Sequence, residues 1–176
     1  MRYSRVTIAL VVLGCLLAPA PAQLRHREPL TQEEIDQLRD AAMDPYARLK
    51  LFTHFARVRL VSVEEMRNDP KITDRSERTH DRLQEFVDIY DELNENIDNF
   101  IERKEDMRRP LKAVIEADSD FHRKLLALKD AAAAAPKDAE PYRFLLDNAL
   151  GAVETGVEDH KQLLAEQETK HNRKSK

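Results

Sequence analysis

A seven-residue repeat of apolar side chains runs through residues 83–132 of this 176-residue chain. Apolar rows with this period form the buried seam along which long helices pack together, so the repeat predicts an all-α fold. The two rows contain only two polar residues, Lys104 and Asp118, and such residues often set the register or the choice of partner. One row consists of Phe86, Leu93, Phe100, Met107, Val114, Phe121 and Leu128, and the other of Leu83, Tyr90, Ile97, Lys104, Leu111, Asp118, Leu125 and Ala132.

The chain before the repeat carries start signals for two helices. Thr31 and Glu34 fit a capping box, in which each side chain satisfies a free backbone N–H group. This motif predicts a short helix within an N-terminal segment, residues 23–43. Asp44 is then a good helix cap, and Pro45 suits the first helical position because it has no hydrogen bond to lose there.

The helix predicted from Asp44 to about Asn68 is apolar on nearly every side. It should end there because Pro70 disfavours helix at the residue before it. A helix that is apolar all round needs neighbours on more than one side. The composition of this segment therefore indicates a closed bundle or an oligomer.

Pro110 decides whether the repeat belongs to one helix or to two. The seven-residue register passes Pro110 without a slip, and residues 102–109 contain no Gly, Asn or Ser that would mark a turn. These details favour one long helix from about Asp74 to Ala135, kinked at the proline. A kinked helix would give an elongated molecule, whereas folding back at Pro110 would give an antiparallel, up-down four-helix bundle.

A final helix is predicted after the break formed by Pro136 and Pro141. It completes a helical bundle domain that we expect to span residues 44–169. The basic residues 170–176 follow, and we expect a disordered tail there because solvated helix ends fray.

The first 22 residues have the three parts of a secretory signal peptide. Arg2 and Arg5 give a cationic start, an apolar stretch follows, and small residues precede a cleavage site between Ala22 and Gln23. Two alternatives stay open: a retained membrane anchor, which normally needs a longer apolar run, and a lipoprotein acylated at Cys15. We expect cleavage and a periplasmic or secreted mature chain without a membrane span.

Cysteine usage and charge exclude several classes of function for such a mature chain. Cys15 is the only cysteine, so cleavage would leave no disulfide, no thiolate nucleophile and no attachment point for c-type haem. Cleavage would also remove two arginines from a chain whose net charge is already −4, which disfavours a nucleic-acid partner. An exported domain without disulfides favours the bacterial periplasm.

Helical bundles can hold metal ions between Glu-x-x-His pairs on facing helices. This spacing occurs twice, at Glu77 and His80 and again at Glu168 and His171. In a folded bundle the first pair should lie near a helix start and the second near a helix end. Since opposite ends of a bundle cannot share an ion, we expect no metal site from these pairs.

His122 and His160 are the remaining weak candidates for metal or haem ligands, because they lie beside apolar faces. Counting along antiparallel helices places His160 level with Lys112, about ten residues from His122. We therefore interpret both as edge histidines with water access, and we expect no cofactor and no catalytic residue. The sequence predicts a non-enzymatic protein that binds or scaffolds a protein partner, or self-associates, through its helix faces. The alternative is a periplasmic metal- or haem-binding four-helix bundle.

Overall fold

The structure, a computed structural model, describes residues 28–174 and contains only helices and connecting turns within that range. The helices are α1 (Gln32–Asp40), α2 (Pro45–Asn68), α3 (Arg75–Glu102), α4 (Arg108–Ala134), α5 (Pro136–Ala139) and α6 (Arg143–Lys174). The all-α prediction is confirmed. The predicted signal peptide, its cleavage site at Ala22 and Gln23, and the lipidation candidate Cys15 lie outside the described residues.

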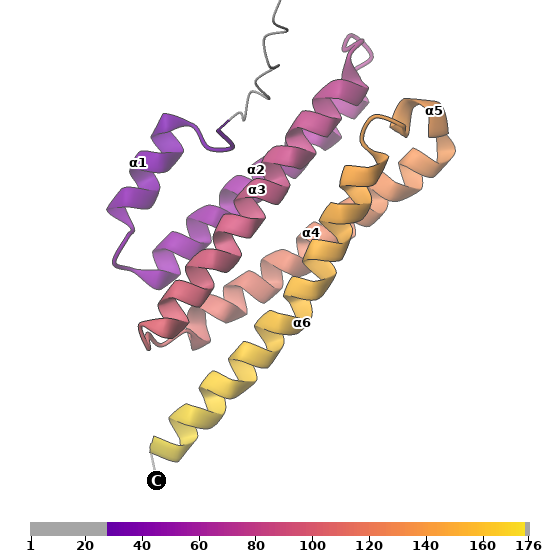
Figure 1. The fold of residues 1–176 in the computed structure, drawn as a ribbon. Helices are drawn as coiled ribbons and strands as arrows, with labels where there is room; N and C mark the ends of the chain where they lie inside the picture. Colours follow the sequence, from indigo (N-terminus) through magenta and orange to yellow (C-terminus); the bar gives the residue numbers. More distant parts are fainter. Residues whose placement is uncertain (1–27, 175–176) are drawn as a thin grey trace, which may run out of the picture.

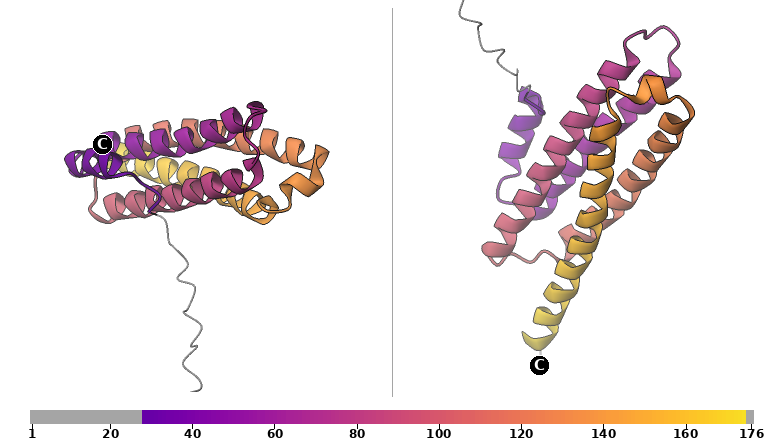
Figure 2. Two further views of the ribbon diagram at one scale, coloured as in Figure 1. Left: turned by 90° about the horizontal axis from the view of Figure 1, so that it is seen from above. Right: turned by 45° about the vertical axis from the view of Figure 1, so that its right-hand side comes forward.

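The four long helices form an antiparallel bundle (Figure 1). The helices α2 and α3 pack as one hairpin, α4 and α6 pack as another, and the two hairpins meet along α2–α4 and α3–α6. The helices α3 and α4 are consecutive in sequence yet lie diagonally across the bundle, as the view from above shows (Figure 2). The chain therefore folds back between α3 and α4, and the elongated form with one long helix is wrong.

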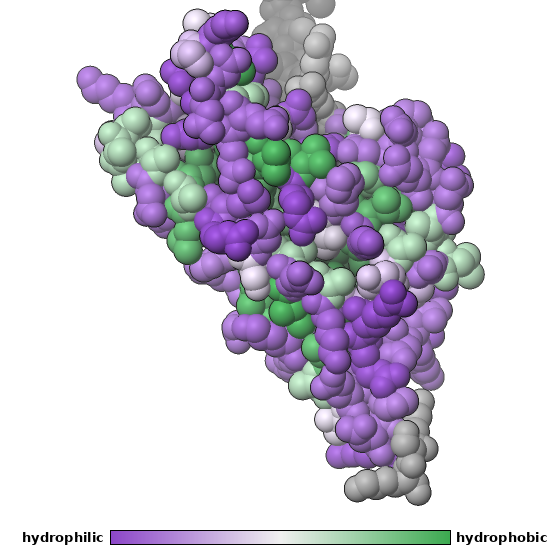
Figure 3. Space-filling model, turned by 180° about the vertical axis from the view of Figure 1, so that it is seen from behind, coloured by the Kyte–Doolittle hydropathy of each residue, from purple (hydrophilic) through white to green (hydrophobic). Residues whose placement is uncertain are grey.

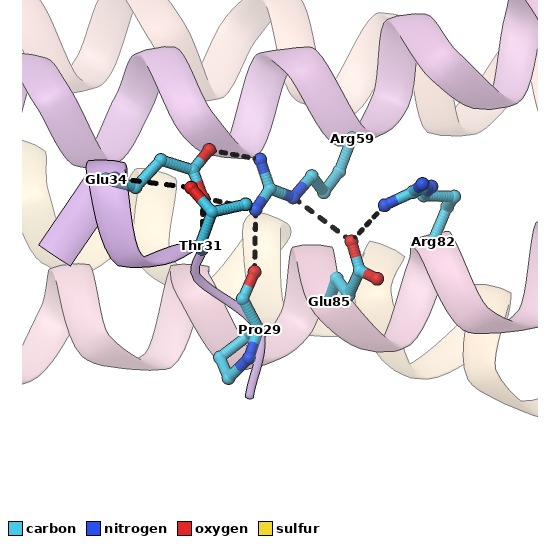
Figure 4. A network of polar contacts seen from close by, with 6 residues as sticks. All are labelled: Pro29, Thr31, Glu34, Arg59, Arg82 and Glu85. Carbon is cyan, nitrogen blue, oxygen red and sulfur yellow. Dashed lines mark hydrogen bonds and ion pairs between the residues drawn. The ribbon is translucent and has the colours of Figure 1, made fainter. Parts of the chain in front are cut away.

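The helix α2 has neighbours on three sides, namely α1, α3 and α4. This arrangement explains its nearly continuous apolar surface. The short helix α1 is fastened to it by Arg59, whose guanidinium donates to both oxygens of Glu34 at 2.5 and 2.7 Å and to the carbonyl of Pro29 at 2.7 Å (Figure 4). Arg59 Nε also lies 3.2 Å from Glu85, which is bound by Arg82 as well. This buried cluster joins α1, α2 and α3.

The core of the bundle is built from the seven-residue repeat. Every apolar member of both rows is buried, with at most 7% of its surface exposed. Of the two polar members, Lys104 is exposed and Asp118 is completely buried. The repeat therefore predicted the buried positions of α3 and α4 although it spans two helices.

The turn between these helices corrects the prediction of a single kinked helix. Lys104 adopts the left-handed conformation, with φ of 61°, and the N–H groups of Lys104 and Glu105 donate to the carbonyls of Ile101 and Phe100. This pattern is a Schellman helix end, in which glycine usually takes the left-handed position. A lysine in that position concealed the turn. Pro110 then lies in the first turn of α4, where proline is tolerated.

Asp106 and Arg108 lie on either side of Met107, the residue that precedes α4. The Asp106 carboxylate accepts the Arg108 N–H at 3.2 Å and the guanidinium at 2.5 and 2.8 Å, and these hydrogen bonds lower the pKa of Asp106 to about 2. Since the folded-state pKa lies below the usual value near 4, the pair stabilises the fold above about pH 4, and this contribution is lost as pH falls toward 2.

We expect an NMR titration of the Asp106 carboxyl carbon to give an apparent pKa near 2. Arg108→Gln removes the charge and the guanidinium hydrogen bonds, so the pKa should return toward 4 in that variant. A midpoint near 4 in the unmodified protein would contradict the pairing.

The last helix is longer than the sequence analysis expected. It runs to Lys174, so it includes residues 170–174, the first part of the segment that the sequence predicts as a tail. Side-chain contacts one turn apart accompany this extension, including Lys170 with Glu166 at 3.9 Å and the Thr169 hydroxyl with the Ala165 carbonyl at 2.9 Å. Such neighbours support an exposed helix.

The surface of the bundle is mostly hydrophilic on the face opposite that of Figure 1, with hydrophobic residues in small patches (Figure 3). A pocket of about 140 Å³ between α2 and α4 is lined in part by Leu60, Val63 and Leu128. Within residues 28–174, no helix combines the length and the apolar character needed to span a bilayer.

Candidate functional site: a buried polar network beneath an acidic groove

Asp118 and His160 form a buried pair in the middle of the bundle. Asp118 projects from α4 and His160 from α6, and His160 Nδ1 lies 2.8 Å from Asp118 Oδ2. Asp118 is completely buried and His160 is 3% exposed. A carboxylate in such a place is costly unless its oxygens are hydrogen-bonded, so the partners of this pair determine whether the core is stable.

Two residues of α3 complete the network. The Tyr90 hydroxyl donates to Asp118 Oδ1 at 2.9 Å, and His160 Nε2 lies 3.1 Å from Asn94 Oδ1. Burial raises the pKa of Tyr90, and the negative charge of Asp118 raises it further, so the phenol stays protonated and remains a donor. Both oxygens of Asp118 are therefore satisfied.

Asp118 and Asn94 determine which ring nitrogen of His160 carries a proton. A protonated ring donates to Asp118 through Nδ1 and to Asn94 Oδ1 through Nε2. A neutral ring with its proton on Nδ1 still donates to Asp118, and the Asn94 amide must then turn to donate its N–H to Nε2. In both cases Nδ1 donates to the carboxylate, which orients the ring in the same way as an Asp–His pair in an active site.

Tyr90 fits against the backbone of α6 at Gly156. A Cβ atom on residue 156 would lie 2.1 Å from the Tyr90 hydroxyl oxygen and 3.1 Å from the ring carbon that carries it. The ring is also stacked on Phe86 with 5.9 Å between the centroids. Only glycine at position 156 lets α6 approach closely enough for His160 to reach Asp118.

A groove of about 480 Å³ lies between α3 and α6 above this network. His160 and Asn94 are among its lining residues, so the network forms part of its floor. Figure 2 shows α3 and α6 side by side. The groove is lined by Asp91, Asn94, Ile97, Asp98, Asp147, Asn148, Gly151, Ala152, Thr155, Gly156, Asp159, His160 and Leu163.

The groove is acidic. Four of its lining residues are aspartates and none is lysine or arginine. Asp147 is paired with Lys129 at 2.8 Å, but Asp91, Asp98 and Asp159 have no ion-pair partner within the described part of the chain. Burial raises the pKa of Asp91, and repulsion from Asp88 and Glu95 adds to the effect. A bound cation would relieve this repulsion.

The structure confirms the predicted edge position of His122 but not that of His160. His122 lies at the edge of α4, 36% of its side chain is exposed, and Nε2 lies 3.3 Å from Glu154. His160 is buried, so its interpretation as an edge histidine with water access is wrong. It faces Asp118 instead of Lys112, which pairs with Glu168 at 3.0 Å. The helix α5 and its flanking turns lengthen the connection and shift α6 along α4.

The two Glu-x-x-His pairs remain separate. His80 is exposed in the first turns of α3, with Nδ1 3.7 Å from Asp81. Glu168 and His171 lie near the far end of α6 (Figure 1). Among residues 28–174, no group of three or more His, Cys, Asp or Glu side chains is placed to hold a metal ion. Both nitrogens of His160 are already engaged, and the metal- or haem-binding alternative stays a prediction.

Asp118 was identifiable from the sequence, but its partner Tyr90 and Asn94, the partner of His160, were not. One signal was available for His160, because it follows Leu146 and Val153 at intervals of seven residues on the apolar face of α6. Because His160 continues this apolar row, the spacing predicts that its side chain is buried. A buried histidine needs polar partners. No such periodic signal existed for Asn94.

No model of a known protein family, no characterised protein and no solved structure matches this chain.

Proposed function

We propose that this protein is an exported, non-enzymatic binding protein that holds an elongated cationic ligand, of the linear polyamine class, in the α3–α6 groove. The observation that carries the proposal is the charge of the groove: three aspartates without an ion-pair partner in the described chain line it, and no lysine or arginine does. Opposite charge steers a ligand to such a cleft and fixes its orientation there.

The spacing of charges suits a ligand with cations separated by short apolar segments. Asp91 and Asp98 are seven residues apart on α3, about 10 Å along the helix at 1.5 Å per residue. Apolar side chains, including Ile97 and Leu163, line the same groove and suit the methylene segments between ammonium groups. The volume of about 480 Å³ is within the usual range for small-molecule sites.

The polar network supports binding by keeping the groove in shape. Asn94 is held by His160, and His160 is held by Asp118, so the floor is ordered before a ligand arrives. Preorganisation of this kind reduces the entropic cost of binding. In the described chain no Ser or Thr hydroxyl is hydrogen-bonded to His160, so the pair has no adjacent nucleophile, and a binding role suits it better than acyl transfer.

Export is the second part of the proposal and rests on residues 1–22. Expression of the full chain with a C-terminal tag in a bacterium, followed by fractionation, tests it. We expect the tagged protein in the periplasmic fraction with Gln23 as its first residue. An intact N-terminus in the cytoplasm would contradict export, and an acylated Cys15 would establish the lipoprotein alternative.

Titration calorimetry with spermidine tests the groove. We expect binding to weaken about fivefold to tenfold in Asp91→Asn and again in Asp98→Asn, because each variant removes one charge from the groove, and to weaken further with added salt. Asp130→Asn is the matched control, since Asp130 is exposed on α4 and does not line the groove. Equal affinity in all three variants, or no heat of binding, would overturn the proposal, and tighter binding of a lysine-rich peptide would reassign the ligand class.

A further inference from the structure

Another cavity lies at the end of the bundle where α2 ends, α3 begins and α5 crosses between α4 and α6. Figure 1 shows these helix ends together at one end of the bundle. Its volume is about 220 Å³. Its polar lining residues include Arg67, Arg75, Ser76, Thr79, Asp138 and Tyr142. None of them lines the acidic groove.

The two arginines of this cavity lack an acidic partner. Arg67 Nη1 donates to the Tyr142 hydroxyl at 2.7 Å, and Arg75 Nη1 donates to the Arg67 carbonyl at 3.3 Å. Neither guanidinium forms an ion pair within the described residues, although most other arginines of the bundle do. Each guanidinium has five N–H groups, so several donors of fixed geometry stay available.

Thr79 supplies an independent observation. Its side chain is completely buried and lines the cavity, and its hydroxyl is one of two buried side-chain polar atoms without a hydrogen bond in the described chain. A buried hydroxyl without a partner destabilises a fold, and the penalty disappears when a ligand accepts its hydrogen bond.

The start of α3 adds donors of the same kind. Asp74 precedes the helix but does not cap the backbone N–H groups of its first turn, and its carboxylate is paired instead with the Arg78 side chain. The first-turn N–H groups at Arg75 and Ser76 therefore lack a side-chain cap, and they carry the partial positive charge of the helix start. Anions bind in this position in many proteins.

We propose that this cavity binds a small tetrahedral oxyanion, phosphate or sulfate. Two guanidinium groups, the Thr79 and Ser76 hydroxyls and the start of α3 surround it, and Asp138 is the one acidic residue among those that line it. The Ser76 hydroxyl now donates to the Asp138 carbonyl at 2.7 Å and can turn toward an anion. Arginine recognises such oxyanions through paired N–H groups, which suits phosphate and sulfate better than chloride.

Thermal unfolding of the full-length mature protein, with phosphate, sulfate or chloride at matched ionic strength, tests the site. We expect millimolar phosphate and sulfate to raise Tm in a saturable manner and chloride to leave it unchanged, because a ligand that binds only the folded state stabilises it. The general stabilising effect of these two anions, which are excluded from protein surfaces, does not saturate and needs much higher concentrations. The same measurement with a phosphate monoester shows whether the site binds free phosphate or a phosphate group attached to a larger molecule. No difference between the anions would overturn the proposal.

Two variants locate the effect. Arg75 is exposed, so Arg75→Gln should fold normally and bind phosphate at least tenfold more weakly by calorimetry. Thr79→Val keeps the side-chain shape, so it should raise Tm without phosphate and reduce the further increase with phosphate. Arg123→Gln, an exposed arginine of α4, is the control. A phosphate effect equal in all three variants would assign it to general anion binding and overturn the site.

Discussion

Replacing Asp118 by alanine should cost about 4 kcal/mol of the free energy of unfolding. The change leaves the Tyr90 hydroxyl and the His160 Nδ1–H without an acceptor in a site where His160 is only 3% exposed. Removal of one partner from a buried, hydrogen-bonded pair typically costs about 3–5 kcal/mol, since the remaining partner stays desolvated. Urea unfolding followed by circular dichroism measures the loss directly.

A control variant and a compensating triple variant test this prediction. Asp130 is exposed on α4, so Asp130→Ala should change the unfolding free energy by less than about 0.5 kcal/mol. The triple variant Tyr90→Phe, Asp118→Leu, His160→Leu replaces the polar groups together and should recover most of the loss, as apolar replacement of buried ion pairs often does. A loss below about 1 kcal/mol in Asp118→Ala would show that the network contributes little to stability.

A comparison of the two outcomes would show what the network is for. If the triple variant is as stable as the natural protein but no longer binds spermidine, the polar residues serve the groove above them. Asn94 and His160 line that groove, whereas Asp118 and Tyr90 do not. Asp118 and Tyr90 would then act only by positioning Asn94 and His160.

The sequence predicted the buried faces of the bundle better than its helix boundaries. Phe100 and Met107 are seven residues apart in one row and both are buried, although the chain leaves the helix between them. The turn keeps the register of the seam, so periodicity alone cannot distinguish it from a kinked helix. Its signal was hidden because Lys104, with φ of 61°, stands where a glycine is usual.

The candidate site was predictable only in part. Asp118 was evident as a polar residue in a buried row, but its partner depended on the stagger of α6 against α4. Residues 135–142 set this stagger through α5 and its flanking turns. Loop conformation is weakly encoded in local sequence. A shift of six residues, about 1.7 helical turns, is enough to make Asp118 instead of Lys112 the neighbour of His160.

The two glycines of α6 should respond to alanine in opposite directions. A Cβ atom on residue 156 would meet the Tyr90 hydroxyl oxygen at 2.1 Å, whereas a Cβ on residue 151 has open space within 4 Å. Tyr90 cannot easily move away, because its hydroxyl is bound to Asp118 and its ring is stacked on Phe86. We expect Gly156→Ala to lower the unfolding free energy by about 2–3 kcal/mol, the usual cost of overpacking a core.

Gly151→Ala should instead raise the unfolding free energy by about 0.5–1 kcal/mol, because alanine is the better helix former and displaces nothing there. Tyr90→Phe removes the closest atom, so Gly156→Ala should cost less in the Tyr90→Phe background than in the unmodified protein, although ring carbons at 3.1 and 3.3 Å would still be crowded. Urea unfolding of Gly151→Ala, Gly156→Ala, Tyr90→Phe and the double variant separates the effect of packing on the unfolding free energy from the effect of helix propensity. If Gly156→Ala were as stabilising as Gly151→Ala, α6 would lie farther from α3 than the network requires, and His160 could not reach Asp118 and Asn94 together.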